Sequence, residues 1–166
     1  MNSYYFNFMF NKIAGNEASR KERMWSDVQR VHHLLTRQIV RNRKSDAWRH
    51  LWPIFILCPD FPVPKNKKAN VKAHNANDGL HIGGVVLAPP PCPSYVPKGI
   101  RQHSSLGKLS RMKVHLDQHF EEKMPQYLTD KLYRIDISPV RYGTMADYTL
   151  KAFKSGKVQY DDIRVF

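Results

Sequence analysis

The chain has 166 residues, which suits one domain of ordinary size with a hydrophobic core of its own. Its two cysteines are too few for a disulfide scaffold or a four-cysteine zinc site. The 27 lysines and arginines outnumber the 14 aspartates and glutamates, so the formal net charge is +13. Such an excess indicates a polyanionic partner, either nucleic acid or an anionic membrane surface.

Nucleic acid is the better of these two partners. No apolar run approaches the roughly 18–20 residues of a membrane-spanning helix, and the first residues lack the basic leader of a signal peptide. We therefore expect a cytoplasmic protein that binds DNA and does not interact with a membrane. In that compartment Cys58 and Cys92 are expected to be reduced.

Residues 1–16 show no clear hydrophobic period, so we expect an N-terminal arm that is only partly ordered. Its aromatic side chains either stack on bases or dock on the rest of the protein. They are Tyr4, Tyr5, Phe6, Phe8 and Phe10. From residue 17 to residue 44, apolar side chains recur every three to four positions, which predicts a helix. Its cations, among them Arg30, Arg37 and Arg41, either contact phosphates or form an ordinary solvated face.

Two strands are predicted in the middle of the chain. Ile54–Cys58 is a continuous apolar run between two prolines, as expected of a buried strand. Leu80–Leu87 is a second apolar run, which follows an Asn-Asp-Gly turn. The connection from residue 59 to residue 79 is polar and basic, and its Lys67 and Lys68 are further candidate contacts for DNA.

The rest of the chain alternates helices with strands, after a proline-rich loop over residues 89–105. The elements predicted there are a helix over 108–123, a strand over 133–137 that Pro139 ends, a helix from Met145 to about Phe153, and a short strand within 158–166. Together with the earlier elements they predict an α+β fold over residues 17–166. In it, helices pack on a central, mainly antiparallel sheet.

His81 lies on the second predicted strand, and Gly83 follows two positions later, so both project from the same face of the sheet. The imidazole is either a metal ligand or a hydrogen-bonded core residue. Gly83 and Gly84 leave space above the sheet, as happens where a ligand or another backbone approaches closely. His115 and His119 also have a spacing that can bind a metal, but a solvated helix face is the preferred interpretation for them.

Tyr148 and Lys151 have the i, i+3 spacing of one helix face, so that a hydroxyl and an ammonium group can lie together. A nearby cation stabilises a phenolate, which can then attack a phosphodiester. The alternative is a half-buried tyrosine beside a lysine that pairs with Asp147. Lys154 and Lys157 extend the basic character of this region and are candidate contacts for DNA.

In this order, the segments resemble the HUH endonuclease superfamily, which comprises the replication initiators, relaxases and related transposases of plasmids, phages and other mobile elements. Within it, the likeness is to replication-initiator-like proteins of bacteria. The resemblance extends over about residues 48–166. The segments that carry it are Trp52–Ile56, Gly79–Leu87, Ala146–Lys151, Lys154–Gly156 and Asp161–Ile163.

The resemblance implies an HUH- or RRM-like palm fold. It also implies a divalent cation, Mg²⁺ or Mn²⁺, held by a histidine-hydrophobe-histidine pair on a strand. A tyrosine of such an enzyme attacks the scissile phosphate and forms a 5′-phosphotyrosine link to single-stranded DNA. Carried over to this chain, His81 would be a metal ligand, Tyr148 would be the nucleophile, and Lys151 would assist with the charge of the phosphate.

The chain departs from this pattern at Gly83, where the second histidine would fall. A cation held by His81 alone would bind weakly unless Asp60, His74 or another residue completed its ligands. We therefore expect an HUH-like protein that binds single-stranded or hairpin DNA, with metal-dependent nicking by Tyr148. The main alternative is a catalytically inactive, basic nucleic-acid-binding protein of the same fold. A module that binds acidic protein partners is a third possibility.

Overall fold

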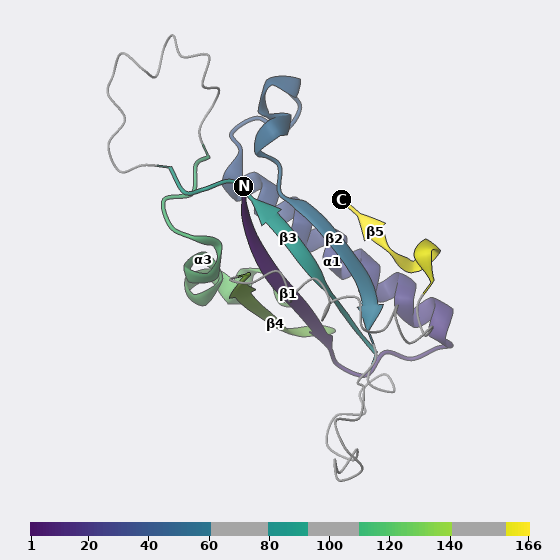
Figure 1. The fold of residues 1–166 in the computed structure, drawn as a ribbon. Coiled ribbons are helices and arrows are strands. Elements are labelled where there is room, and N and C mark those ends of the chain that lie inside the picture. Colours follow the sequence, from purple (N-terminus) through teal and green to yellow (C-terminus); the bar gives the residue numbers. More distant parts are fainter. Residues whose placement is uncertain (61–79, 93–109, 141–158) are drawn as a thin grey trace, which may run out of the picture.

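The computed structural model describes residues 1–60, 80–92, 110–140 and 159–166. Its strands form one five-stranded sheet in the order β4-β1-β3-β2-β5, and every neighbouring pair is antiparallel (Figure 1). The elements are β1 (Asn2–Phe10), α1 (Glu17–Ile39), the 3-10 helix η1 (Asp46–Leu51), β2 (Ile54–Asp60), β3 (His81–Ala88), α3 (Leu116–Lys123), η4 (Met124–Gln126), β4 (Leu132–Pro139), η5 (Tyr160–Asp162) and β5 (Arg164–Val165). The predicted α+β fold with a mainly antiparallel sheet is therefore confirmed.

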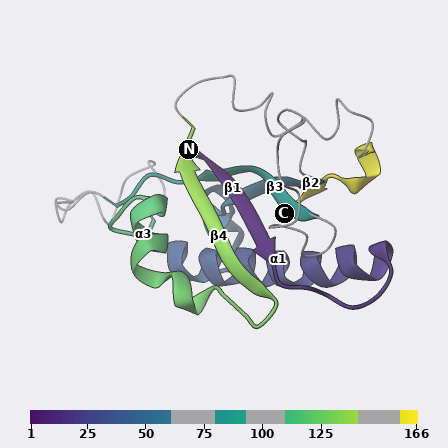
Figure 2. The same cartoon turned by 90° about the horizontal axis from the view of Figure 1, so that it is seen from below.

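Helices α1 and α3 cover one face of the sheet (Figure 2). The Phe6 ring of β1 lies 5.7 Å from the Phe55 ring of β2 and 5.4 Å, edge-on, from Phe120 of α3. His32 of α1 lies 5.0 Å from the same Phe55 ring. These rings of β1, β2, α1 and α3 form one cluster. Helices α1 and α3 therefore pack on the same face of the sheet. We call the other side of the sheet the open face, since no α-helix in the described ranges packs against it.

Strand β1 lies between β4 and β3 and is therefore an interior strand of the sheet. Tyr4, Phe6, Phe8 and Phe10 alternate along it, face the helices and are buried. The prediction of a partly ordered arm over residues 1–16 was wrong, because these four rings belong to the core. Between them lie side chains of the open face. That face carries Tyr5, Asn7 and Met9 from β1, Ile56 and Asp60 from β2, and His81, Gly83 and Val85 from β3.

The predicted helices are shorter in the structure. Helix α1 begins after Asn16, whose side chain accepts a hydrogen bond from the Ser19 amide (2.9 Å). It ends at Ile39, and the backbone of Val40 is extended. Residues 41–44 are all polar and carry no apolar side chain that could continue the buried stripe of the helix. Helix α3 begins at Leu116 instead of residue 108, and the described residues just before it are not helical. The four predicted strands are confirmed as β2, β3, β4 and β5, whereas the helix predicted from Met145 lies outside the described residues.

Two histidines are buried on the helical side of the sheet. His119 of α3 lies with its Nε2 2.8 Å from the Tyr127 hydroxyl, so the interpretation of a solvated helix face was wrong for this residue. His115 precedes the helix, and its Nδ1 lies 3.3 Å from the Tyr4 hydroxyl. On α1, the Nε2 of His32 lies 3.0 Å from the Pro53 carbonyl oxygen. These contacts dock the helices on the sheet, and burial removes His119 from the surface, whereas His115 remains exposed.

Acid is expected to destabilise the protein through His32 and His119. Burial lowers the pKa of both imidazoles below their usual value, so the folded state keeps them neutral. In the unfolded chain the pKa of a histidine is about 6.5. Their contribution to stability is therefore fully present above that pH and is lost as the pH falls toward the lower folded-state pKa. Urea unfolding between pH 7.5 and pH 5 should show a falling midpoint.

The variant His32→Gln should flatten this dependence of the urea midpoint on pH, because it removes one of the two buried imidazoles. His33→Gln is the matched control, since His33 is the next residue on α1 and is exposed. A midpoint that falls equally steeply in His32→Gln and in the unmodified protein would contradict the assignment of acid sensitivity to this residue.

Candidate functional site

His81 and Asp60 form a contact pair on the open face. His81 is the first residue of β3 and Asp60 the last of β2, and the register places them directly opposite each other. The His81 Nε2 lies 3.2 Å from the Asp60 Oδ2, and the two side chains are 16% and 3% exposed. A carboxylate that is almost fully buried requires a polar or cationic partner. The structure therefore brings the predicted ligand His81 together with Asp60, one of the residues considered for completing a cation site.

Gly83 occupies the position at which the HUH resemblance would place a second histidine. It follows His81 by two positions on the same face, and its direct neighbours across the strands are Asn7 of β1 and Cys58 of β2. A Cβ at Gly83 would lie 3.3 Å from the Tyr5 hydroxyl and 4.0 Å from the Asn7 Oδ1. This Oδ1 is buried and has no hydrogen-bond partner. The space beside His81 is thus bordered by two polar side chains of β1.

Gly84 has a different role from Gly83, because it faces the helices. A Cβ at this position would lie 2.2 Å from the Ile56 carbonyl oxygen and 2.8 Å from the Leu57 Cα. A glycine on a strand leaves room for either a ligand or another backbone that approaches closely. At Gly84 the neighbouring backbone of β2 takes this room. Gly83 lies on the face that carries His81, and the Tyr5 hydroxyl lies 3.3 Å from the position of a Cβ there.

Of the predicted phosphate contacts, Arg30 and Arg37 lie on α1 and Arg41 follows its end. Helix α1 covers the face of the sheet opposite the one from which His81 projects (Figure 2). Arg37 and Arg41 are exposed, whereas Arg30 is half-buried, donates to the Tyr127 carbonyl oxygen and lies 3.7 Å from the Asp27 carboxylate. A shallow hollow of about 420 Å³ runs along this side of α1. Its lining contains no carboxylate and consists of Ser26, Gln29, Arg30, His33, Leu34, Arg37 and Arg43. The described residues therefore form two separate candidate surfaces, one that carries the Asp60–His81 pair and one that is basic.

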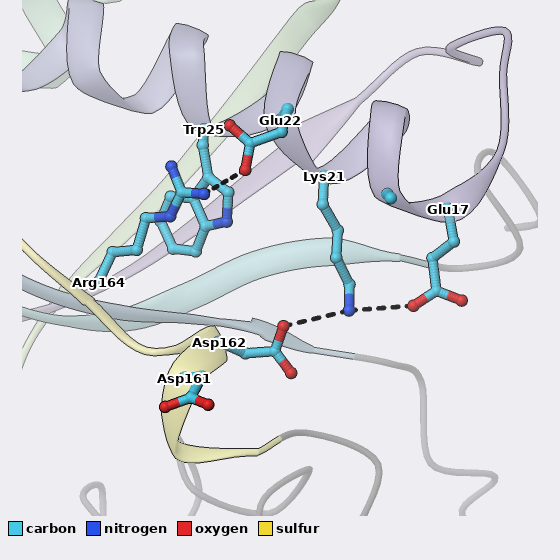
Figure 3. Close-up of a pocket in the computed structure, with 8 residues that line it drawn as sticks. Glu17, Lys21, Glu22, Trp25, Asp161, Asp162 and Arg164 are labelled. Atoms are coloured by element: carbon cyan, nitrogen blue, oxygen red, sulfur yellow. Dashed lines mark hydrogen bonds and ion pairs between the residues drawn. The ribbon is translucent and has the colours of Figure 1, made fainter.

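A second hollow, of about 440 Å³, lies between the start of α1 and the last residues of the chain (Figure 3). Lys21 Nζ lies 3.0 Å from the Glu17 carboxylate and 3.3 Å from the Asp162 carboxylate. Arg164 stacks over the Trp25 ring, 5.0 Å from its centroid, and pairs with Glu22. Lysine and arginine groups of the chain itself thus contact three of the four carboxylates. We interpret this hollow as the contact that docks η5 and β5 on α1.

Several predicted site residues lie outside the described residues. They are Lys67, Lys68, His74, Tyr148, Lys151, Lys154 and Lys157. The described residues on either side of Tyr148 attach at opposite edges of the sheet. The Val140 amide donates to the Ser3 carbonyl oxygen beside β4 (2.9 Å), whereas η5 leads into β5 beside β2.

The donors available for a divalent cation are few. Within the described ranges, no group of three or more His, Cys, Asp or Glu side chains could hold a metal ion. Asp60 and His81 provide one carboxylate and one imidazole, both of which ligate first-row divalent metals. The unpartnered Asn7 oxygen adds a neutral oxygen donor near Gly83. The open face therefore offers a carboxylate, an imidazole and an amide from three adjacent strands.

The fold and this site define the class as an α+β protein whose sheet carries the Asp60–His81 pair on one face and the described α-helices on the other. In comparisons with known protein families, curated proteins and solved structures, nothing matches the chain. None of the helices in the part of the chain that the structure describes has the length and apolar character of a membrane span. The residues of the site are thus the basis for a functional assignment.

Proposed function

We propose that the protein binds single-stranded or hairpin DNA and nicks it as an HUH-type replication initiator or relaxase does. The observation that carries the proposal is the contact between Asp60 and His81 at the end of the β2–β3 pair, on the face opposite the helices. A carboxylate and an imidazole at this distance are suited to hold Mg²⁺ or Mn²⁺ near a phosphate. The net charge of +13 supports a nucleic acid as the substrate.

The chemistry proposed is a transesterification in which Tyr148 is the nucleophile. Its hydroxyl oxygen loses a proton to solvent or base and forms a bond to the phosphorus, and the bond from phosphorus to the 3′-oxygen of the preceding nucleotide breaks. That oxygen takes up a proton, so the products are a free 3′-hydroxyl and a 5′-phosphotyrosine. Lys151 would stabilise the phenolate by its positive charge. A bound divalent cation would reduce the negative charge of the scissile phosphate.

Asp60 and His81 would hold this cation between their carboxylate and imidazole groups. The basic residues would contribute affinity for the DNA backbone without reading its sequence. Those described are Arg30, Arg37 and Arg41, and those outside the described residues are Lys67, Lys68, Lys154 and Lys157. Arg37 and Arg41 are exposed, so they are better placed for phosphates than Arg30, which is engaged with Tyr127.

The test is formation of a covalent adduct on labelled single-stranded and hairpin oligonucleotides in the presence of Mn²⁺. The unmodified protein should give a DNA-linked band on a denaturing gel, and Tyr148→Phe should give none. Tyr160→Phe is the matched control, because Tyr160 is 76% exposed and has no role in the proposed reaction. His81→Gln and Asp60→Asn should each lower the adduct yield by about 10–100-fold while DNA binding persists.

A catalytically inactive DNA-binding protein is the second candidate, and the missing side chain at Gly83 favours it. It predicts binding without any metal requirement, with an affinity that falls by roughly 0.7 log unit per phosphate contact for each tenfold rise in salt. No adduct from the unmodified protein, together with such binding, would select this candidate. Failure to bind any oligonucleotide at low salt would contradict both and favour an acidic protein partner.

A further inference from the structure

The second half of α1 and the residues after it are basic and lack acidic side chains. Between Asp27 and Asp46 the sequence contains no aspartate or glutamate. The lysines and arginines of this interval are Arg30, Arg37, Arg41, Arg43 and Lys44. All except Arg30 are exposed, and within the described residues no ion pair engages these exposed side chains. Their positive charge is therefore available to an anionic partner.

A distant segment of the chain adds another cation at the end of α1. The Arg111 amide donates a hydrogen bond to the carbonyl oxygen of Ile39, the last residue of the helix (2.8 Å). Arg111 is exposed, and it too forms no ion pair within the described residues. The fold thus brings cations from two separate segments to one end of α1. We call Arg37, Arg41, Arg43, Lys44 and Arg111 the basic cluster.

The hollow of about 420 Å³ along α1 leads into the basic cluster, because Arg37 and Arg43 contribute to both. From Ser26 to Arg37 its lining residues recur every three to four positions, so they share one face of the helix. This face rises by about 16 Å, whereas successive phosphates of one DNA strand are about 3.4 Å apart along the duplex axis. The hydroxyl, amide and guanidinium groups of Ser26, Gln29 and Arg37 all donate to phosphate oxygens. The surface is therefore suited to several successive phosphates.

The composition of the hollow favours a duplex over a single strand. Among the described residues that line it, none is a phenylalanine, tyrosine or tryptophan. Proteins that bind single strands combine cations with aromatic rings on which the bases stack. A duplex keeps its bases stacked on one another and presents its phosphates, which arginine, hydroxyl and amide groups bind without any base contact.

We propose that the basic cluster and the hollow along α1 form a second DNA site, which binds the phosphate backbone of a duplex. The site lies on the side of the sheet that α1 covers, whereas His81 projects from the open face (Figure 2). The inference goes beyond the proposed function, because duplex binding requires neither a divalent cation nor Tyr148. In a hairpin substrate, the paired stem is the part that this surface would bind.

The experiment is fluorescence anisotropy of the full chain with a labelled, blunt-ended duplex of about 20 base pairs in EDTA, at several salt concentrations. Arg37→Gln combined with Arg43→Gln should weaken binding at least about tenfold at low salt. The slope of log affinity against log salt should become about 1.8 units shallower, because each lost phosphate contact removes about 0.9. Lys12→Gln combined with Lys131→Gln is the matched control. It removes the same charge from two exposed residues that lie near the start of α1, and the slope should stay unchanged.

The outcomes separate this inference from the proposed function. Equal losses of duplex affinity in the two double variants would overturn the site, because they would reflect net charge alone. An unmodified protein that forms the covalent adduct with a single strand but binds no duplex would overturn the second site and leave the proposed function intact. Duplex binding without any adduct would support the second site and contradict the nicking reaction. Displacement of the duplex by poly-glutamate at the same concentration of charge would assign the surface to an acidic protein and overturn the inference.

Discussion

Phe6→Ala is expected to lower the free energy of unfolding by about 3–5 kcal/mol. The Phe6 side chain is fully buried, and its ring lies within 5.4–5.7 Å of Phe8, Phe55 and Phe120. It therefore joins β1, β2 and α3, and its removal leaves a cavity that none of these elements can fill without moving. The free energy of unfolding of small domains is only about 5–15 kcal/mol, so this substitution would remove a large part of it.

Urea unfolding followed by circular dichroism measures the effect. Met9→Ala is the matched control, because Met9 lies on the same strand but projects from the open face and is only partly buried. Met9→Ala should lower the free energy of unfolding by less than about 1 kcal/mol. Equal and small effects at Phe6 and Met9 would mean that residues 2–10 are a loosely docked arm and not an interior strand.

Gly84→Ala is expected to destabilise the protein by about 1–3 kcal/mol, whereas Gly83→Ala should be nearly neutral. At Gly84 the new methyl group would meet the backbone of β2, with 2.2 Å to the Ile56 carbonyl oxygen, so the strand itself must shift. At Gly83 the closest atom is the Tyr5 hydroxyl at 3.3 Å, which is the end of a side chain and can rotate away. Alanine also restricts the unfolded chain more than glycine, which offsets any small cost at Gly83.

The same pair of variants can be compared by thermal unfolding, because each differs from the unmodified protein by a single methyl group. Similar melting temperatures for Gly83→Ala and Gly84→Ala would contradict the assignment of the two glycines to opposite faces. A preserved fold in Gly83→Ala would also show that this position tolerates a side chain. Larger side chains at Gly83 would then be useful probes of the space next to His81.

The elements with a strong hydrophobic period were predictable from the sequence. Helix α1 has an apolar residue at nearly every third or fourth position, and all of these are buried against the sheet. Strands β2 and β3 are continuous apolar runs with turn residues at their ends. The strand order was not predictable, because it depends on pairings between segments far apart in the chain.

Strand β1 was missed because its two faces differ little in hydrophobicity. Tyr5 and Met9, on the open face, resemble the buried residues that flank them, so the alternation is weak. Asn2, Ser3 and Asn7 are the polar residues of the strand, apart from the tyrosine hydroxyls. The buried residues of β1 nevertheless recur with the period of two that is typical of a strand.

The candidate site was predictable only in part. His81 was identified from its strand, and Asp60 was one of two residues considered as its companion. Their contact depends on the β2–β3 register, which a long connection between the strands does not determine. Asn7 comes from a strand more than 70 positions away in sequence, so no local pattern relates it to Gly83. The burial of His119 was not predicted, because it depends on the contact with the Tyr127 hydroxyl, which lies beyond the end of α3.

The central position of β1 has a consequence for how the protein is made. Its hydrogen-bonding partners are β3, more than 70 residues later, and β4, more than 120 residues later. Ribosomes synthesise the amino terminus first, so this aromatic segment emerges long before either partner exists. A short, uncharged segment of high strand propensity tends to pair with other chains until its partner strands have been synthesised. Slow translation or a high expression temperature should therefore favour aggregates, and co-expressed chaperones should increase the soluble yield.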